Sequence, residues 1–169
     1  MLGKADAHAG VDSAGAGART VSLRHDPRLI DELKRANREA MMSYSVALHA
    51  GRRGSFDAAA LAISRCARQL HDVQRTEALR LYPTIARRMA NDHEGAAAVA
   101  ALRRDANALV RHFMRLVEGL FSRARPGMPS DELIAEARSV LQKYLAEKES
   151  RLYRVYALTA PPDGDARRT

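Results

Sequence analysis

The chain has 169 residues, a formal net charge of +8 at pH 7 and one cysteine, and 46% of its residues are hydrophobic. This length predicts one domain with a full hydrophobic core. No apolar run is long enough to span a bilayer, no apolar signal core stands near the N-terminus, and Cys66 has no partner for an internal disulfide. We therefore expect a cytoplasmic protein without membrane contact, in which Cys66 is a buried thiol.

The composition favours helices. Alanine, leucine, arginine and glutamate dominate, and β-branched residues do not alternate with polar ones, so an all-α fold is predicted. The arginines come in scattered pairs, such as Arg52–Arg53, Arg87–Arg88 and Arg103–Arg104, with acidic residues between them and no interleaved aromatics. This pattern is typical of a solvated helix surface rather than a nucleic-acid site.

Residues 1–24 are rich in alanine, glycine and aspartate without periodicity, which predicts a flexible N-terminal arm. The first helix is predicted from Asp26, as N-cap, and Pro27, at the first helical position, to about Ala50. Asn37 falls on its apolar stripe. The other members of that stripe are Ile30, Leu33, Ala40, Met41, Tyr44 and Leu48.

Gly51 and Gly54 end the first helix, and Ser55 is a candidate cap for the second, which is predicted over residues 56–89. Pro83 is expected to kink this helix, because proline removes a backbone hydrogen bond and clashes with the preceding turn. The predicted buried stripe is Ala59, Ile63, Cys66, Leu70, Val73, Glu77, Leu81 and Ile85.

A break at Asn91 and Asp92 precedes a third helix over residues 96–123, and the loop 126–129 precedes a fourth, capped by Ser130 and ending near Leu158. The third stripe is Val99, Leu102, Ala106, Leu109, Phe113, Leu116 and Leu120. The fourth is Ile134, Ala137, Leu141, Tyr144, Lys148, Leu152 and Val155. Four such helices joined by short loops predict an up-down-up-down antiparallel four-helix bundle over residues 25–159, followed by a flexible tail over residues 160–169.

Four polar residues interrupt the inner stripes: Asn37, Glu77, Tyr144 and Lys148. Charged side chains are rarely buried unless they are paired, so Glu77 and Lys148 are predicted to meet inside the bundle, with Asn37 and Tyr144 supplying hydrogen bonds. In the alternative, the helices rotate by a fraction of a turn and both charges reach solvent.

The segment Glu77-Ala-Leu-Arg-Leu-Tyr-Pro83 resembles the second-helix motif of hemerythrin-like (HHE) domains, in which H-x-x-x-E is followed by Leu-aromatic-Pro. The fourth-helix motif of that family would fall on the segment from Tyr144 to Tyr153, and the layout is similar over roughly residues 26–158. The resemblance implies a four-helix bundle and, in the family, a diiron centre.

Most of the diiron ligands that this resemblance implies are absent. The positions of the family's ligands fall on Asn37, Val73, Glu77, Ala106, Tyr144 and Lys148. Only Glu77 keeps the family's residue type, and an ammonium group at position 148 would repel a cation. We therefore expect no metal or cofactor, and an ion pair in the place of the irons. The alternative is an oxygen- or iron-binding protein with a diiron site made from other ligands.

A second resemblance is to the regulator of sigma D/AlgQ family, which binds the primary sigma factor of RNA polymerase. Leu29-Ile30-Asp31 and Arg38 resemble the start of its first helix. Its second-helix motif is matched at Leu70, Asp72, Leu79 and Tyr82, but Glu77-Ala78 replaces its Gly-His pair. This resemblance implies a sigma-factor-binding transcription regulator.

No nucleotide-binding glycine motif and no G-x-S-x-G nucleophile motif is present. The sequence therefore favours a non-enzymatic, bacterial-type, hemerythrin-like bundle that has lost its diiron site and acts by binding a protein partner, with a regulatory role. The identity of that partner and the oligomeric state stay open.

Overall fold

The computed structural model describes residues 25–122 and 131–160, and all regular structure within these ranges is helical. The predicted all-α class is therefore confirmed. The elements are α1 (Leu29–Arg52), α2 (Phe56–Thr76), the π-helical segment η1 (Glu77–Leu81), α3 (Tyr82–Arg88), α4 (His93–Ser122), α5 (Asp131–Glu147), the π-helical segment η2 (Lys148–Leu152) and α6 (Tyr153–Leu158). They make four rods, because η1 joins α2 directly to α3 and η2 joins α5 directly to α6.

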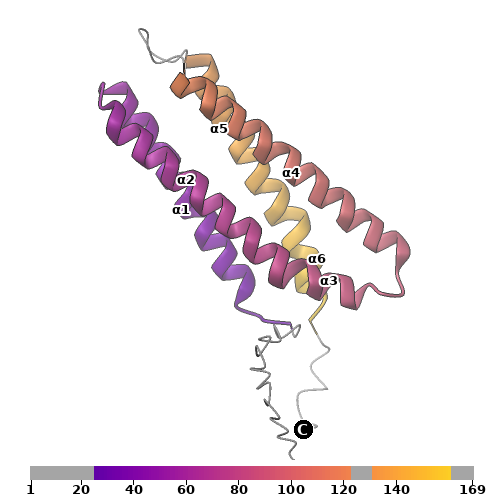
Figure 1. The fold of residues 1–169 in the computed structure, drawn as a ribbon. Coiled ribbons are helices and arrows are strands. Elements are labelled where there is room, and N and C mark those ends of the chain that lie inside the picture. Colours follow the sequence, from indigo (N-terminus) through magenta and orange to yellow (C-terminus); the bar gives the residue numbers. More distant parts are fainter. Residues whose placement is uncertain (1–24, 123–130, 161–169) are drawn as a thin grey trace, which may run out of the picture.

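The four rods pack lengthwise as two close pairs (Figure 1). α1 lies along α2, and α4 lies along α5. The beginning of α1 and the end of α6 meet at one end of the molecule, where the backbone N–H of Asp26 donates to the hydroxyl of Tyr156 over 2.8 Å. The His25 and Tyr156 rings also stack there, with centroids 4.6 Å apart.

Two apolar clusters fill the interior. One contains Tyr44, Leu70 and Phe113, and the other contains Leu81 together with residues from the beginning of α1 and from α6. Every residue of the stripe predicted for the second helix is buried. This agreement follows from the strict helical spacing of apolar residues there, which leaves one face able to enter the core.

Cys66 is fully buried in the first cluster, as predicted. Burial raises the pKa of its thiol to about 12, so the thiol is protonated at neutral pH.

Helix α1 begins later than predicted. Its first residue is Leu29 rather than Pro27, because residues 26–28 form a turn. The Asp26 carboxylate still accepts the backbone N–H of Arg28 over 2.9 Å, so it caps this turn. Ser55 is the N-cap residue of α2, as predicted, but its side chain makes no capping hydrogen bond. Gly54 before it adopts a φ of 75°, which favours glycine.

Helix α4 begins at His93, three residues before the predicted start. The Asp92 carboxylate accepts the backbone N–H of Gly95 over 2.8 Å, which satisfies one of the free donors of the first turn. A Cβ at position 95 would lie 2.3 Å from Asp92 Oδ2, so a larger residue there would require the Asp92 carboxylate to shift. The predicted arm 1–24, the loop 126–129, the Ser130 cap and most of the tail lie outside the described residues.

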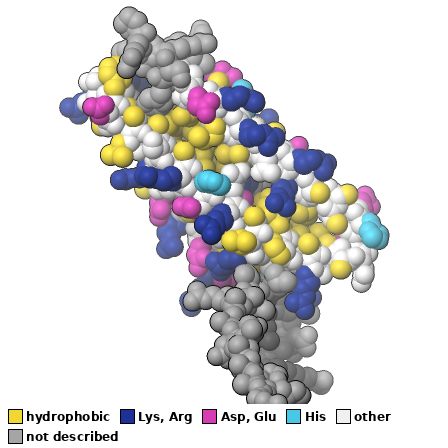
Figure 2. All heavy atoms as spheres, in the orientation of Figure 1, with side chains coloured by type: hydrophobic (Ala, Val, Ile, Leu, Met, Phe, Trp, Pro, Cys, Tyr) yellow, Lys and Arg dark blue, Asp and Glu magenta, His cyan; other side chains and the backbone are white. Residues whose placement is uncertain are grey.

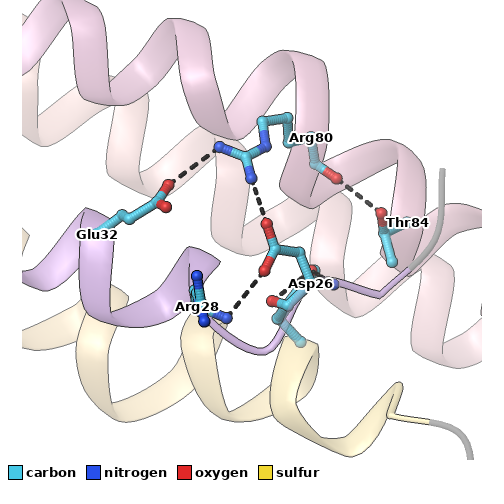
Figure 3. A network of polar contacts seen from close by, with 6 residues as sticks. Asp26, Arg28, Glu32, Arg80 and Thr84 are labelled. Atoms are coloured by element: carbon cyan, nitrogen blue, oxygen red, sulfur yellow. Dashed lines mark hydrogen bonds and ion pairs between the residues drawn. The ribbon is translucent and has the colours of Figure 1, made fainter. Parts of the chain in front are cut away.

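A polar clamp ties the second rod to the beginning of α1 (Figure 3). The Arg80 guanidinium contacts Asp26 over 2.5 Å and Glu32 over 3.1 Å. The Thr84 hydroxyl donates to the backbone oxygen of Arg80 over 2.8 Å. Since Arg80 lies in η1, the clamp fixes the position of that segment against α1.

Candidate functional site

A buried ion pair occupies the middle of the molecule. Lys148 Nζ lies 2.6 Å from Glu77 Oε1, and the two residues are only 1% and 3% exposed. The hydroxyl of Tyr153 donates to the same Glu77 oxygen over 2.8 Å. The predicted pairing of the two charges is therefore present in the structure, and the alternative in which both charges reach solvent is not.

Asn37 and Tyr144 extend this pair into a network. Asn37 Nδ2 donates to the Tyr153 hydroxyl over 3.0 Å, so it reaches Glu77 through that tyrosine rather than directly. Lys148 Nζ donates to the Tyr144 hydroxyl over 2.9 Å and lies 4.5 Å from the centre of the same ring. We refer to these five residues, Asn37, Glu77, Tyr144, Lys148 and Tyr153, as the inner network. All four residues predicted for it belong to it, and Tyr153 is an addition.

Tyr153 was missed because of the π-helical segments. A π-helix bonds each N–H to the carbonyl five residues back and so holds one residue more per turn than expected. In η2 the N–H of Tyr153 bonds to the carbonyl of Lys148, and beyond it Tyr153 and Tyr156 are buried while Val155 is only half-buried. A stripe read at a constant 3.6 residues per turn places Val155 inward instead.

Both π-helical segments begin on a charged member of the inner network: η1 on Glu77 and η2 on Lys148. Pro83 lies two residues beyond the end of η1, whereas the first proline after η2 is Pro161, nine residues beyond its end. Proline therefore does not explain what the two segments share. The shared feature is the ion pair itself, which joins the two widened turns across the interior.

The electrostatics of the inner network follow from its burial. Removal from water lowers the pKa of Lys148, and the neighbouring Glu77 charge opposes this shift. Burial raises the pKa of Tyr144 and of Tyr153, and the Glu77 charge raises both further. The tyrosines are therefore neutral hydroxyl groups at neutral pH, and neither is an activated nucleophile or base.

The residues of this site do not suit a diiron centre. One oxygen of the only carboxylate, Glu77, is bound by an ammonium group and a hydroxyl. Asn37 Oδ1 is buried and has no hydrogen-bond partner among the described residues, but one amide oxygen is a weak addition to a ligand set. Within the described ranges, no three or more His, Cys, Asp or Glu side chains gather where they could hold one metal ion.

A groove runs between α2 and α4. Two cavities, of about 530 Å³ and about 350 Å³, lie along it and share His71 and Gln74 in their linings. A single described hydrogen bond crosses it, from Gln74 Nε2 to Asn107 Oδ1 over 3.2 Å. We call the combined lining of these two cavities the α2–α4 groove. Figure 2 shows hydrophobic side chains gathered on this face, with Lys and Arg side chains beside them.

The smaller cavity of the groove reaches the inner network at Glu77 and Tyr144. A third cavity, of about 310 Å³ between α4 and the last rod, reaches Lys148. Ala106 lines both. The resemblance to hemerythrin-like domains implies a histidine near this position, where this chain has the smaller alanine.

Comparison with protein-family models, curated proteins and solved structures gives no significant match to this chain. Among the helices in the described part of the chain, none is both long enough and apolar enough to cross a membrane.

Proposed function

We propose that this chain is a non-enzymatic up-down-up-down antiparallel four-helix bundle of hemerythrin-like type, in which an ion pair replaces the two irons, and that it acts by binding a protein partner. The contact of Lys148 Nζ with Glu77 Oε1 over 2.6 Å carries the proposal. An ammonium group in that position neutralises the one carboxylate that the resemblance retains and disfavours a divalent cation by charge repulsion.

The chemistry of the interior supports a role other than catalysis. Burial raises the pKa of the Cys66 thiol to about 12 and raises the pKa of both network tyrosines, which keeps these groups protonated. Activated nucleophiles and general bases require the opposite environment. The outer surface, by contrast, offers a long groove bordered by arginines, which is a feature suited to recognition of another macromolecule.

The metal-free part of the proposal is tested on full-length protein purified aerobically. Elemental analysis and an absorption spectrum are recorded before and after anaerobic incubation with ferrous iron and re-oxidation. We expect no stoichiometric iron and no oxo-bridge absorption in either sample. Stoichiometric iron with that absorption would show that the chain holds a diiron site and would overturn this part of the proposal.

The partner-binding part is tested by immobilising the full-length chain, passing an extract of the source organism over it, and identifying retained proteins by mass spectrometry. We expect one protein to be retained in stoichiometric amount and to bind again when purified. If no purified candidate binds at micromolar concentration, the partner-binding role fails. A retained sigma factor would identify the regulator-type alternative.

A further inference from the structure

The arginines of the α2–α4 groove are arranged in a regular way that the sequence alone did not reveal. On α4, Arg103, Arg111 and Arg115 line the groove at spacings of eight and four residues, with Asn107 at the fourth position between the first two. Residues four apart lie on one face of a helix, so these side chains form one edge of the groove. Arg68 and Arg75 supply the opposite edge from α2.

These five arginines are exposed, and none makes an ion pair with any residue in the described ranges. Arg103 stacks over the Tyr82 ring with its guanidinium 4.7 Å from the ring centre. The groove lining contains two carboxylates: Glu118 at one end, and Glu77, whose charge is balanced by Lys148. Five arginines against these two carboxylates give the groove lining a net positive charge.

The floor between these edges is apolar. Ala67, Leu70, Val110 and Met114 line the larger cavity, and Ala106 lies in the smaller one. Sites that bind nucleic acid combine basic residues that follow the phosphate backbone with exposed aromatic rings on which bases stack. An apolar floor provides neither kind of contact. An apolar channel between basic edges matches an amphipathic helix with acidic flanks.

The dimensions also fit a helix. From Arg103 to Glu118 the lined part of α4 rises about 22 Å at 1.5 Å per residue, which is about four helical turns. A helix packed beside α2 and α4 would make contacts of the same kind as those between the rods of the molecule itself. An occupant of roughly 15 residues would fill this length.

Two occupants that this protein itself could place in the α2–α4 groove lack the acidic charge that would pair with its arginines. Residues 1–24 contain three Lys or Arg and two Asp, so the segment carries no excess of acid. A second copy of the chain carries a net charge of +8 and would bring like charges together. An occupant with an excess of acidic residues would therefore come from another protein.

We infer that the α2–α4 groove binds an amphipathic helix with acidic flanks from a partner protein, with apolar side chains on the floor and carboxylates paired to the arginines of both edges. This inference rests on the proposed partner-binding function and names the surface and the chemistry of the partner.

The test uses the full-length chain and two synthetic helical peptides of equal length and apolar face, one with glutamates and one with lysines on the flanks. Fluorescence anisotropy of the labelled peptides measures binding. We expect the acidic peptide to bind with micromolar affinity that falls as salt rises, and the basic peptide to bind at least about tenfold more weakly.

Charge-reversal variants locate the binding site. The double variant Arg75→Glu with Arg111→Glu changes one arginine on each edge of the groove, and we expect it to weaken the acidic peptide at least about tenfold. The matched control, Arg38→Glu with Arg154→Glu, makes the same change in net charge at exposed positions on α1 and α6 and should leave affinity within about twofold. Far-UV circular dichroism verifies that both variants fold.

Several outcomes would overturn the inference. It fails if neither peptide binds, if both peptides bind equally, or if the two double variants weaken binding to the same degree. If the wild-type protein dimerises through the groove, the occupant is a second copy of the chain. If the peptide binds only after residues 1–24 are removed, the occupant is the chain's own N-terminal arm. A partner that is captured equally by wild type and the groove variant would leave the proposed function standing and remove this surface from it.

Discussion

Lys148 and Glu77 contribute to stability as a pair rather than as separate charges. Each has been removed from water, and breaking a buried ion pair by removing one member leaves the other without compensation, which destabilises a protein by about 3–5 kcal/mol. Replacing both members by apolar side chains of similar size is often neutral or stabilising. Single and double substitutions of this pair should therefore differ in their effect on the free energy of unfolding.

We expect Lys148→Met to lower the free energy of unfolding by about 3 kcal/mol near neutral pH, because the Glu77 carboxylate stays buried with only the Tyr153 hydroxyl to bind it. Urea denaturation near neutral pH measures the effect.

The double variant Glu77→Leu with Lys148→Met should be more stable than Lys148→Met alone. If both the single and the double variants match wild type, the pair makes no net contribution and this account of it is wrong. Because Tyr144 and Tyr153 keep their hydroxyl groups in these variants, near-ultraviolet circular dichroism separately reports any change in their packing.

Residue types on a helical stripe were enough to predict that Asn37, Glu77, Tyr144 and Lys148 lie close together. Charge then predicted which two of them would pair, since neither is stable alone in an apolar interior. Tyr153 could not be predicted in the same way, because its inward position depends on a change of helical period that no residue type announces. The arginines form scattered pairs along the sequence, whereas the structure places Arg103, Arg111 and Arg115 along one side of the α2–α4 groove.

At the scale of elements, the four rods agree with the predicted helices to within a few residues. Apolar spacing determines the faces, and proline, glycine and aspartate mark most of the ends. The errors have local causes: the turn at residues 26–28 and the carboxylate of Asp92, which starts α4 early by accepting the Gly95 N–H. Neither π-helical segment is predicted from the sequence. Each segment begins on a charged member of the buried ion pair, η1 on Glu77 and η2 on Lys148.

The π-helical segments lead to a prediction about deletions. Deleting Ser150, which is exposed within η2, removes the extra residue and allows ordinary α-helical bonding while Tyr153 and Tyr156 keep their inward direction. We expect this variant to fold cooperatively with a loss of a few kcal/mol, mainly from displacement of Leu152. Thermal unfolding followed by circular dichroism gives the measurement.

Deletion of Ser139, an equally exposed serine in the α-helical part of α5, is the control. It rotates all following residues of that rod by about 100° and carries the predicted inner face out of the core. We expect no cooperative unfolding for this variant. Equal damage from the two deletions would contradict a special role for η2.

At the scale of the whole molecule, the buried groups predict how stability depends on pH. The pKa values of Tyr44 and Cys66 are each raised to about 12, chiefly by burial, and those of Tyr82, Tyr144 and Tyr153 are also raised. A group whose folded pKa exceeds its unfolded value stabilises the fold below the unfolded pKa and loses that contribution as pH rises toward the folded pKa. Lys148 acts in the opposite direction, because its pKa is lowered.

Five buried groups have raised pKa values and one lysine has a lowered pKa. We therefore expect the free energy of unfolding to fall from about pH 9 upward. For Tyr44 the shift from 10.0 to about 12 corresponds to roughly 2–3 kcal/mol in total, of which about half is lost by pH 11. Urea denaturation between about pH 8 and pH 11 tests this. The variant Tyr44→Phe should be less stable at neutral pH, since it loses a hydrogen bond to the Ile134 carbonyl, but its stability should fall less steeply with pH. A stability that is constant or rises over this range would contradict the prediction.

The fold class and the buried ion pair thus follow from periodicity and charge, whereas the α2–α4 groove could not be predicted from them. Ala106, for example, lines cavities on both sides of α4. Helical spacing places Ala106 on an inner stripe but does not reveal the space beside it.

The inner network also has a consequence for how long the folded state lasts. Glu77 and Tyr153 are 76 residues apart in the chain and lie on the second and fourth rods. Contacts of such long separation are among the last to form, after neighbouring helices have paired locally. Contacts that form late act mainly on the rate of unfolding rather than on the rate of folding. We therefore expect the contacts of the inner network to slow the unfolding of the molecule more than they speed its folding.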